Sequence, residues 1–233
     1  MELNLIQKIS IWVIPVIFAI TLHEAAHGYV AKFLGDKTAW MLGRVTLNPL
    51  KHIDPVGTIL VPLTILLLSK VLGGGFILFG WAKPVPVNFG ALHSPKRDML
   101  WVAAAGPAAN LMMAIFWALV IKLGGVLGDS YTQPLELMGA AGIYINAVLM
   151  ALNLLPLPPL DGGRIAVSLL PPKLAYRFEK IEPYGFYVLL ALMFLGWLWL
   201  ILSPLIMLIL VITSGFSGIS FAHLNDLLNS VIN

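Results

Sequence analysis

Long apolar runs separated by short polar stretches make up most of this chain. They occupy residues 5–34, 56–72, 99–123, 137–155, 184–202 and 205–219. An α-helix rises 1.5 Å per residue, so about 20 apolar residues cross the roughly 30 Å hydrocarbon core of a bilayer. Most of the runs have about this length. The pattern therefore predicts an all-α polytopic membrane protein with about five to six transmembrane helices.

Two stretches interrupt the helical pattern. Three glycines at 73–75 end the second run, and prolines follow them. We expect a re-entrant extended segment around residues 73–90, with a plain membrane crossing as the alternative. The last two runs meet at Ser203 and Pro204, where we expect either a hairpin or one kinked element.

Composition agrees with a membrane protein. Hydrophobic residues make up 59% of the 233 residues and charged residues 11%, against about 25% charged residues in ordinary soluble domains. The absence of cysteine excludes disulfides and thiolate metal ligands. The net charge of +3 is small, which argues against a nucleic-acid surface. Because no long polar block is present, we expect one integral-membrane domain over 1–233, with a catalytic core at about 5–163 and C-terminal helices at about 184–232.

Basic side chains gather in three segments, whereas the loop that we expect around Asp129 and Glu136 is acidic. The basic residues are Lys37, Arg44 and Lys51, then Lys83, Lys96 and Arg97, then Arg164, Lys173, Arg177 and Lys180. Cytosolic loops are enriched in Lys and Arg, so we expect all three segments on the cytosolic side of the cell (plasma) membrane. This orientation makes the run at 137–155 parallel to the run at 5–34, and it places Asp161 and the active site nearer the cytosolic face.

The first apolar run contains the pattern His23-Glu24-Ala25-Ala26-His27. On a helix, histidines four residues apart project from nearly the same face and can bind one Zn²⁺. Glu24 lies beside them, where it can take a proton from a metal-activated water. A chance match or a polar packing cluster is the alternative. Ionisable groups inside a membrane helix each cost on the order of 2.5–3.5 kcal/mol, which favours a functional site.

A catalytic zinc ion usually has three protein ligands and one open position. Asp161 is the candidate for the third ligand, because prolines at 156, 158 and 159 end the preceding helix near the expected depth of the histidines. A simple turn at a helix end is the alternative explanation for Asp161-Gly162. His52 and His93 could occupy the fourth zinc position or line a cavity, although such residues more often cap turns.

Three motifs together resemble the site-2 protease family of intramembrane zinc metalloproteases: HEAAH at 23–27, AGPAAN at 105–110 and NLLPLPPLDG at 153–162. The stretches GRVTLNPLKHIDPVGT and GWAKPVPVN are similar to its compact bacterial and archaeal branch. The connection between the apolar runs at 99–123 and 137–155 is too short for the PDZ domain that larger members insert there.

The resemblance implies one Zn²⁺ per chain, held by three ligands: His23, His27 and Asp161. It implies that Glu24 activates the water and that Asn153 contacts the substrate backbone or the developing oxyanion. It also places Asn110 near the catalytic region or the substrate, with close helix packing among small residues as the alternative.

The proline-containing stretch suggests how a substrate is held. In an extended chain, residues two apart direct their N–H groups to the same edge, so Pro84 and Pro86 remove donors from one edge only. The opposite edge, at Lys83, Val85 and Val87, keeps its donors and could bind an unwound substrate by strand addition. A stiff loop without such a role is the alternative.

These features predict a zinc-dependent endopeptidase that hydrolyses peptide bonds within or near transmembrane or signal-peptide-like segments, as in regulated intramembrane proteolysis. Its partners are then those substrates and membrane lipid; the substrate identity and the oligomeric state stay open. A divalent-metal transporter is the alternative, since such side chains also mark ion pathways, but we would then expect paired repeats. A catalytically inactive membrane chaperone is a third option, against which the intact Glu24 argues.

Overall fold

The computed structural model describes residues 3–61, 63–64 and 80–232, and these residues form helices and loops without a strand. Four helices are long and apolar enough to cross a membrane: α1 (Leu5–Phe33), α4 (Pro95–Leu127), α5 (Asp129–Asn153) and α9 (Trp197–Ser217). A shorter apolar helix, α8 (Glu182–Phe194), adds to them. The expected all-α polytopic membrane fold is confirmed, with four spans and α8 in the described part. Most of the run at 56–72 lies outside the described residues.

Helix α1 begins and ends close to the predicted positions. The Asn4 side chain accepts a hydrogen bond from the backbone N–H of Gln7, and the Gln7 side chain accepts one from the backbone N–H of Asn4, each at 2.9 Å. This capping box satisfies donors that the first turn leaves free. Gly35, with a φ of 114°, follows the last turn, and such a conformation favours glycine. The apolar run and its caps thus define one helix of 29 residues.

Helices α4 and α5 form a tight antiparallel hairpin. Gly128, at a φ of 100°, is the only residue between them, so the acidic loop expected around Asp129 and Glu136 is wrong: both residues belong to α5. A glycine can reverse the chain here without a longer loop, and an acidic residue at a helix start is favourable. A Cβ at Gly142 would lie 2.2 Å from the Trp117 ring, so the two helices need glycine there to approach this closely.

The C-terminal third contains five helices: α6 (Asp161–Leu169), α7 (Pro172–Glu179), α8, α9 and α10 (Phe221–Ile232). Of the two alternatives expected at Ser203 and Pro204, the hairpin is wrong, because both residues lie inside the single helix α9. The chain turns instead at Gly196, whose φ of 72° is in the left-handed region that favours glycine. Buried leucines of α10 join the core.

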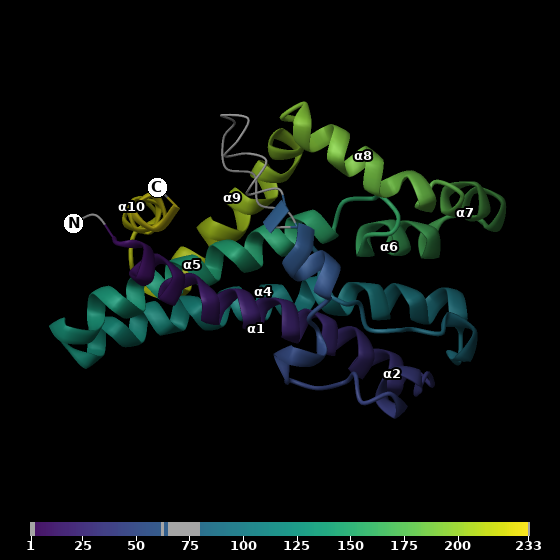
Figure 1. Cartoon of the computed structure of the whole chain (residues 1–233), viewed down its shortest axis with the longest axis horizontal. Coiled ribbons are helices and arrows are strands. Elements are labelled where there is room, and N and C mark those ends of the chain that lie inside the picture. The colour runs from purple at the N-terminus through teal and green to yellow at the C-terminus, as the bar shows by residue number, and fades with distance from the viewer. Residues whose placement is uncertain (1–2, 62, 65–79, 233) are drawn as a thin grey trace.

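One apolar core joins α1, α4, α5, α9 and α10. In Figure 1, α1 in purple lies along α4, and contacts at Ala19–Asn110 and His27–Val102 show that the two helices are antiparallel. Because α4 is also antiparallel to α5, α1 and α5 run in the same direction, as the sequence predicts. The C-terminal ends of α1 and α5 therefore reach the same end of the molecule, where the N-terminal part of α4 also lies.

The connection between α1 and α4 holds short helical turns: α2 (Thr38–Met41), two 3₁₀ turns at Pro49–Lys51 and Phe89–Ala91, and a π-helical turn at Pro55–Leu60. Residues 80–88 are non-helical, as expected for the second half of a segment at 73–90, whose residues 73–79 lie outside the described part. The Trp81 N–H donates to the Gly57 carbonyl at 3.0 Å. Gly57 and Trp81 therefore lie side by side, and most of the residues between them, on which the re-entrant segment and the plain crossing differ, lie outside the described part.

Candidate metal centre

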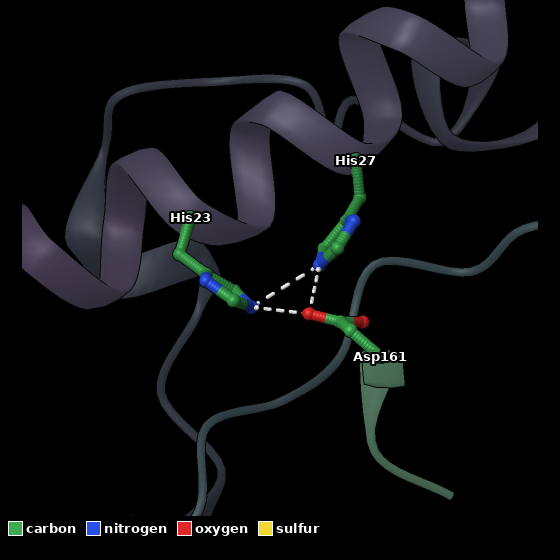
Figure 2. Close-up of side chains that lie close together, drawn as sticks. All are labelled: His23, His27 and Asp161. Atoms are coloured by element: carbon green, nitrogen blue, oxygen red, sulfur yellow. Dashed lines mark hydrogen bonds and ion pairs between the residues drawn. The ribbon is translucent and has the colours of Figure 1, made fainter. Parts of the chain in front are cut away.

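Three ligand atoms converge where the C-terminal part of α1 meets the start of α6. The Nε2 atoms of His23 and His27 lie 3.1 Å apart, and each is 3.3 Å from Oδ2 of Asp161. Figure 2 shows both imidazoles on one face of α1, with Asp161 reaching them from the start of α6. Each of the three residues is at most 9% exposed. The structure therefore brings together the three residues that the sequence predicts as metal ligands.

This arrangement fits a bound cation. Two neutral imidazole nitrogens at 3.1 Å direct lone pairs at each other unless a proton or a cation lies between them. Oδ2 of Asp161 is buried and lies 3.3 Å from each Nε2 atom without a hydrogen bond in the described part of the chain, so a cation shared by the three atoms would satisfy it. Two histidines and one carboxylate are a common ligand set of catalytic zinc, which keeps a fourth position open. No other group of this kind occurs in the described part of the chain.

Helix α4 orients both imidazoles through their second nitrogens. Nδ1 of His27 lies 2.7 Å from the carbonyl oxygen of Val102, and Nδ1 of His23 lies 2.6 Å from Oδ1 of Asn110. A Cβ at Gly106 would come within 2.5 Å of both rings, so only glycine allows α4 this close to the ligands. Partners of this type fix the ring orientation and the tautomer of a metal-binding histidine. Asn110 thus contacts the candidate centre.

Asp161 reaches the histidines because the chain folds back sharply after α5. Prolines at 156, 158 and 159 keep the connection after Asn153 from continuing the helix. A Cβ at Gly162 would lie 2.3 Å from the Leu154 and Leu155 carbonyl oxygens, and one at Gly163 would lie 2.4 Å from the Pro158 nitrogen. The two glycines let the first turn of α6 press against this connection, which directs Asp161 toward α1.

Glu24 lies in the same cavity and is held by the proline-containing stretch. Its Oε2 accepts a hydrogen bond of 2.7 Å from the backbone N–H of Val85. The cavity has a volume of about 420 Å³ and is lined by Glu24, the three candidate ligands and further residues that include Val87 and Asn153. Space for a peptide segment thus lies beside the predicted general base.

The residues predicted to bind substrate are placed differently. Val85, Val87 and Asn153 line the cavity, whereas Lys83 is not among the described lining residues. The Lys83 N–H donates to the His52 carbonyl at 2.9 Å, so the donors of both Lys83 and Val85 are used within the chain. The Asn153 amide donates to the Leu149 carbonyl of its own helix at 2.9 Å. Binding of a substrate strand at this edge would have to displace existing hydrogen bonds.

Other contributors to the site were not predicted from the sequence. Val102 acts through its backbone carbonyl, for which side-chain patterns give no signal. Asn146 bonds to Asn110 and is fully buried; a lone amide inside an apolar run is the signal that could have revealed it. His52 is buried and bonds to the Thr46 carbonyl, while His93 packs against Gly35. Neither of these histidines is among the described residues that line the cavity.

A helical protein with several membrane spans, an HExxH on the first of them and an aspartate that meets both histidines has the architecture of a membrane metalloprotease. Comparison with known proteins agrees with this class. The chain belongs to Peptidase family M50, which includes the site-2 proteases; the family pattern matches residues 128–196.

Relatives extend the match over most of the chain. A Bacillus subtilis (strain 168) protein named "Putative zinc metalloprotease YwhC" is 42% identical over 184 residues, which cover 77% of this chain and 78% of that protein. A Mycolicibacterium smegmatis protein named "Putative zinc metalloprotease Rip2" is 29% identical over 181 residues, or 76% of this chain and 64% of that protein. No solved structure matches the chain.

Family membership decides between the functions that the sequence leaves open. The chain is a zinc metalloendopeptidase integral to a membrane, and the expected zinc cofactor and hydrolase activity are confirmed at this level. The divalent-metal transporter is therefore not supported.

Proposed function

We propose that this zinc metalloprotease is an intramembrane endopeptidase, which hydrolyses peptide bonds within or near transmembrane segments of other membrane proteins. The observation that carries the proposal is the position of His23 and His27 inside the membrane-spanning part of α1, Ile6–Phe33. A peptide bond must reach that depth to meet the centre. A transmembrane or signal-peptide-like segment that unwinds locally can present one there, because helical hydrogen bonding otherwise covers the scissile carbonyl.

Each side chain has a role in this proposal. His23, His27 and Asp161 would hold the zinc ion, which supplies Lewis-acid activation of water and of the scissile carbonyl. The Glu24 carboxylate takes a proton from the attacking water and delivers it to the leaving amine nitrogen as the peptide C–N bond breaks. Asn153 lies on the cavity wall. Once its amide no longer donates to the Leu149 carbonyl, the amide donates to the substrate backbone or the developing oxyanion.

The edge at Lys83, Val85 and Val87 is the proposed place for an unwound substrate strand. Support comes from the non-helical course of residues 80–88, several of which line the cavity. The Arg44 guanidinium donates to the Lys83 and Pro84 carbonyl oxygens at 2.9 and 3.3 Å, which fixes this stretch to the connection after α1. Main-chain pairing would hold substrates of varied sequence.

We further propose that the centre lies nearer the cytosolic face of the plasma membrane. The three basic segments contact one another beside the cavity: Arg44 donates to the Lys83 carbonyl, Lys96 donates to the Leu170 carbonyl, and Arg164 lines the cavity. Positive charge marks the cytosolic side. The chain has no cysteine, so a single cysteine can be introduced without first replacing native ones. We expect Lys173→Cys to resist a membrane-impermeant maleimide in intact cells and to react in inverted vesicles, with Tyr131→Cys as the opposite control. The reverse pattern would place the centre on the outer side.

The one-domain organisation over residues 1–233 also stands as a proposal. Its support is the shared core of α1, α4, α5, α9 and α10, which joins the C-terminal helices to the helices of the centre.

The decisive test compares purified wild-type protein with Glu24→Gln. We expect both to hold one zinc ion per chain, and only the wild type to cleave a model transmembrane peptide in proteoliposomes, with a rate loss of at least 10²-fold in the variant. A water-soluble peptide with the same scissile sequence serves as the substrate control. Cleavage confined to the soluble peptide, or wild-type cleavage by Glu24→Gln, would overturn the proposal.

A further inference from the structure

A chain of buried hydrogen bonds leads from the candidate centre through three helices. Nδ1 of His23 on α1 lies 2.6 Å from Oδ1 of Asn110 on α4. The Asn110 amide nitrogen donates to Oδ1 of Asn146 on α5 at 3.0 Å, and the Asn146 amide nitrogen donates to the Gly142 carbonyl at 2.8 Å. Both asparagines are 0% exposed. The far end of this chain is a backbone carbonyl remote from the ligands.

We infer that Asn146 is a positioning residue: acting through Asn110, it keeps the proton of His23 on Nδ1 and so leaves Nε2 free to bind the metal. The inference rests on the proposed role of His23 as a zinc ligand. Asn146 itself contacts neither His23 nor the other two candidate ligands through any hydrogen bond in the described structure.

The Gly142 carbonyl, at the far end of this series of hydrogen bonds, fixes which group donates in each of them. A backbone carbonyl can only accept, so the side of Asn146 that faces the Gly142 oxygen must be its NH₂ group. Its carbonyl oxygen then faces Asn110 and requires the Asn110 NH₂ group. The Ala19 carbonyl, 3.4 Å from the same nitrogen, imposes the same orientation. Oδ1 of Asn110 is thereby turned toward His23, and because this oxygen only accepts, Nδ1 of His23 must carry the hydrogen.

The opposite orientation of the two asparagine amides would be unfavourable at two places. Flipping both amides would set carbonyl oxygens against the Gly142 and Ala19 carbonyls and leave buried acceptors facing each other. It would also place a hydrogen on Nε2 of His23, where the metal must bind. The two buried backbone carbonyls thus select the tautomer that can bind a metal.

His27 provides an internal comparison. Its Nδ1 faces the Val102 carbonyl directly, at 2.7 Å, so its tautomer is set by the backbone and by no other side chain. The tautomer of His23 depends on two side chains. A change at Asn146 is therefore expected to affect His23 and leave His27 as it is, although both histidines share one metal.

The test uses the full chain with three variants. Asn146→Leu keeps the approximate shape of the side chain and removes its hydrogen bonds to Asn110 and to the Gly142 carbonyl. Asn146→Asp keeps, in either protonation state, an acceptor for the Asn110 amide. Thr213→Val is the control for loss of a buried polar group, because the fully buried Thr213 hydroxyl bonds, within the described residues, only to carbonyls of its own helix. Zinc affinity is measured by competition with a chelator, and the ring tautomers by ¹⁵N NMR of the metal-free protein labelled at its five histidines.

We expect Asn146→Leu to weaken zinc binding about 10-fold or more and to move His23, but not His27, toward the Nε2–H tautomer. Asn146→Asp and Thr213→Val should keep wild-type values in both measurements. If Asn146→Leu does not fold, Asn146→Ser, whose side chain is too short to reach Asn110, provides the same comparison.

An unchanged His23 tautomer in the folded Asn146 variant would overturn the inference, as would equal zinc loss in Asn146→Leu and Thr213→Val. Failure of the proposed role of His23 as a zinc ligand would look different: His23→Ala would bind zinc as tightly as wild type. The tautomer measurement needs no metal and no substrate. It therefore tests the effect of Asn146 on His23 separately from zinc binding and from proteolysis.

Discussion

The backbone N–H of Val85 donates to Oε2 of Glu24 across 61 positions of sequence. The proline on either side of Val85 has no N–H, so Val85 is the donor that this part of the stretch offers to the cavity. The predicted general base and the predicted substrate-binding edge therefore share one hydrogen bond. A substrate strand that pairs with Val85 would take this donor from Glu24.

Replacing Val85 by proline tests this contact. Val85→Pro removes the N–H that orients Glu24, and we expect zinc to be retained while cleavage of a transmembrane peptide falls about 10-fold or more. Val85→Ala keeps the N–H and should cleave normally. Wild-type cleavage by Val85→Pro would argue against any role of this donor.

Val87→Pro separates the two uses of the edge. Strand addition requires donors at both positions, so it predicts that Val87→Pro also loses cleavage. Orientation of Glu24 requires Val85 alone, and it predicts normal cleavage by Val87→Pro. Rates of the two proline variants, measured on one substrate, therefore decide whether the stretch pairs with substrate.

Gly106→Ala should abolish zinc binding. The added methyl group would lie 2.5 Å from Cε1 of His23 and from Nε2 of His27, in the space where the ligands converge. Gly125→Ala, on the same helix, meets no atom within 4 Å and serves as the matched control. We expect Gly125→Ala to keep zinc and to be as stable as wild type or slightly more so. Full zinc occupancy in Gly106→Ala would show that α4 can move away from α1.

Asp36→Asn should destabilise the protein at neutral pH. Burial alone would raise the pKa of Asp36, but hydrogen bonds from Thr38 and from the Asn88 backbone outweigh it and hold the pKa below 3.8. A lowered pKa in the folded state stabilises the fold above pH 3.8, and this contribution is lost as the pH falls through the folded-state pKa.

We therefore expect Asp36→Asn to cost about 1–3 kcal/mol at pH 7, since the amide cannot accept at both positions. The difference from wild type should shrink in acid. Thermal unfolding in detergent, from pH 7 to below pH 3.8, measures this difference in stability, with a substitution at the exposed Asp226, Asp226→Asn, as the control. A constant difference at every pH would mean that ionisation of Asp36 does not stabilise the fold.

Zinc should stabilise the fold because its candidate ligands come from α1 and from α6. A ligand present at 100 times its dissociation constant stabilises by about 2.7 kcal/mol. We expect a chelator to lower the melting temperature of the wild type and of Glu24→Gln, and to leave Asp161→Ala unchanged. An equal response of Asp161→Ala would place the metal elsewhere.

The parts of the fold that follow from apolar length and period could be predicted. Helix α1 ends within one residue of its expected limit, and the parallel course of α1 and α5 followed from charge. The turns could not be placed as well. Gly128 and Gly196 reverse or bend the chain, while Pro204 is accommodated inside a helix, because tertiary packing decides which of several glycines and prolines is used.

The candidate site shows the same division. His23, Glu24, His27 and Asp161 could be selected because their side chains have metal or proton chemistry and stand out in an apolar sequence. The Val102 carbonyl could not, since every residue has one. The internal use of the Lys83 and Val85 donors also escaped prediction, because it depends on partners far away in sequence.

Two of the groups that surround the histidines, the Val102 carbonyl and the bare backbone at Gly106, belong to the main chain of α4. The shape of the centre is consequently as stiff as a helix, and mutation can obstruct it more easily than remodel it. Sliding of α4 against α1 would disturb both imidazoles together, because the Val102 carbonyl and the Gly106 backbone move as one with α4.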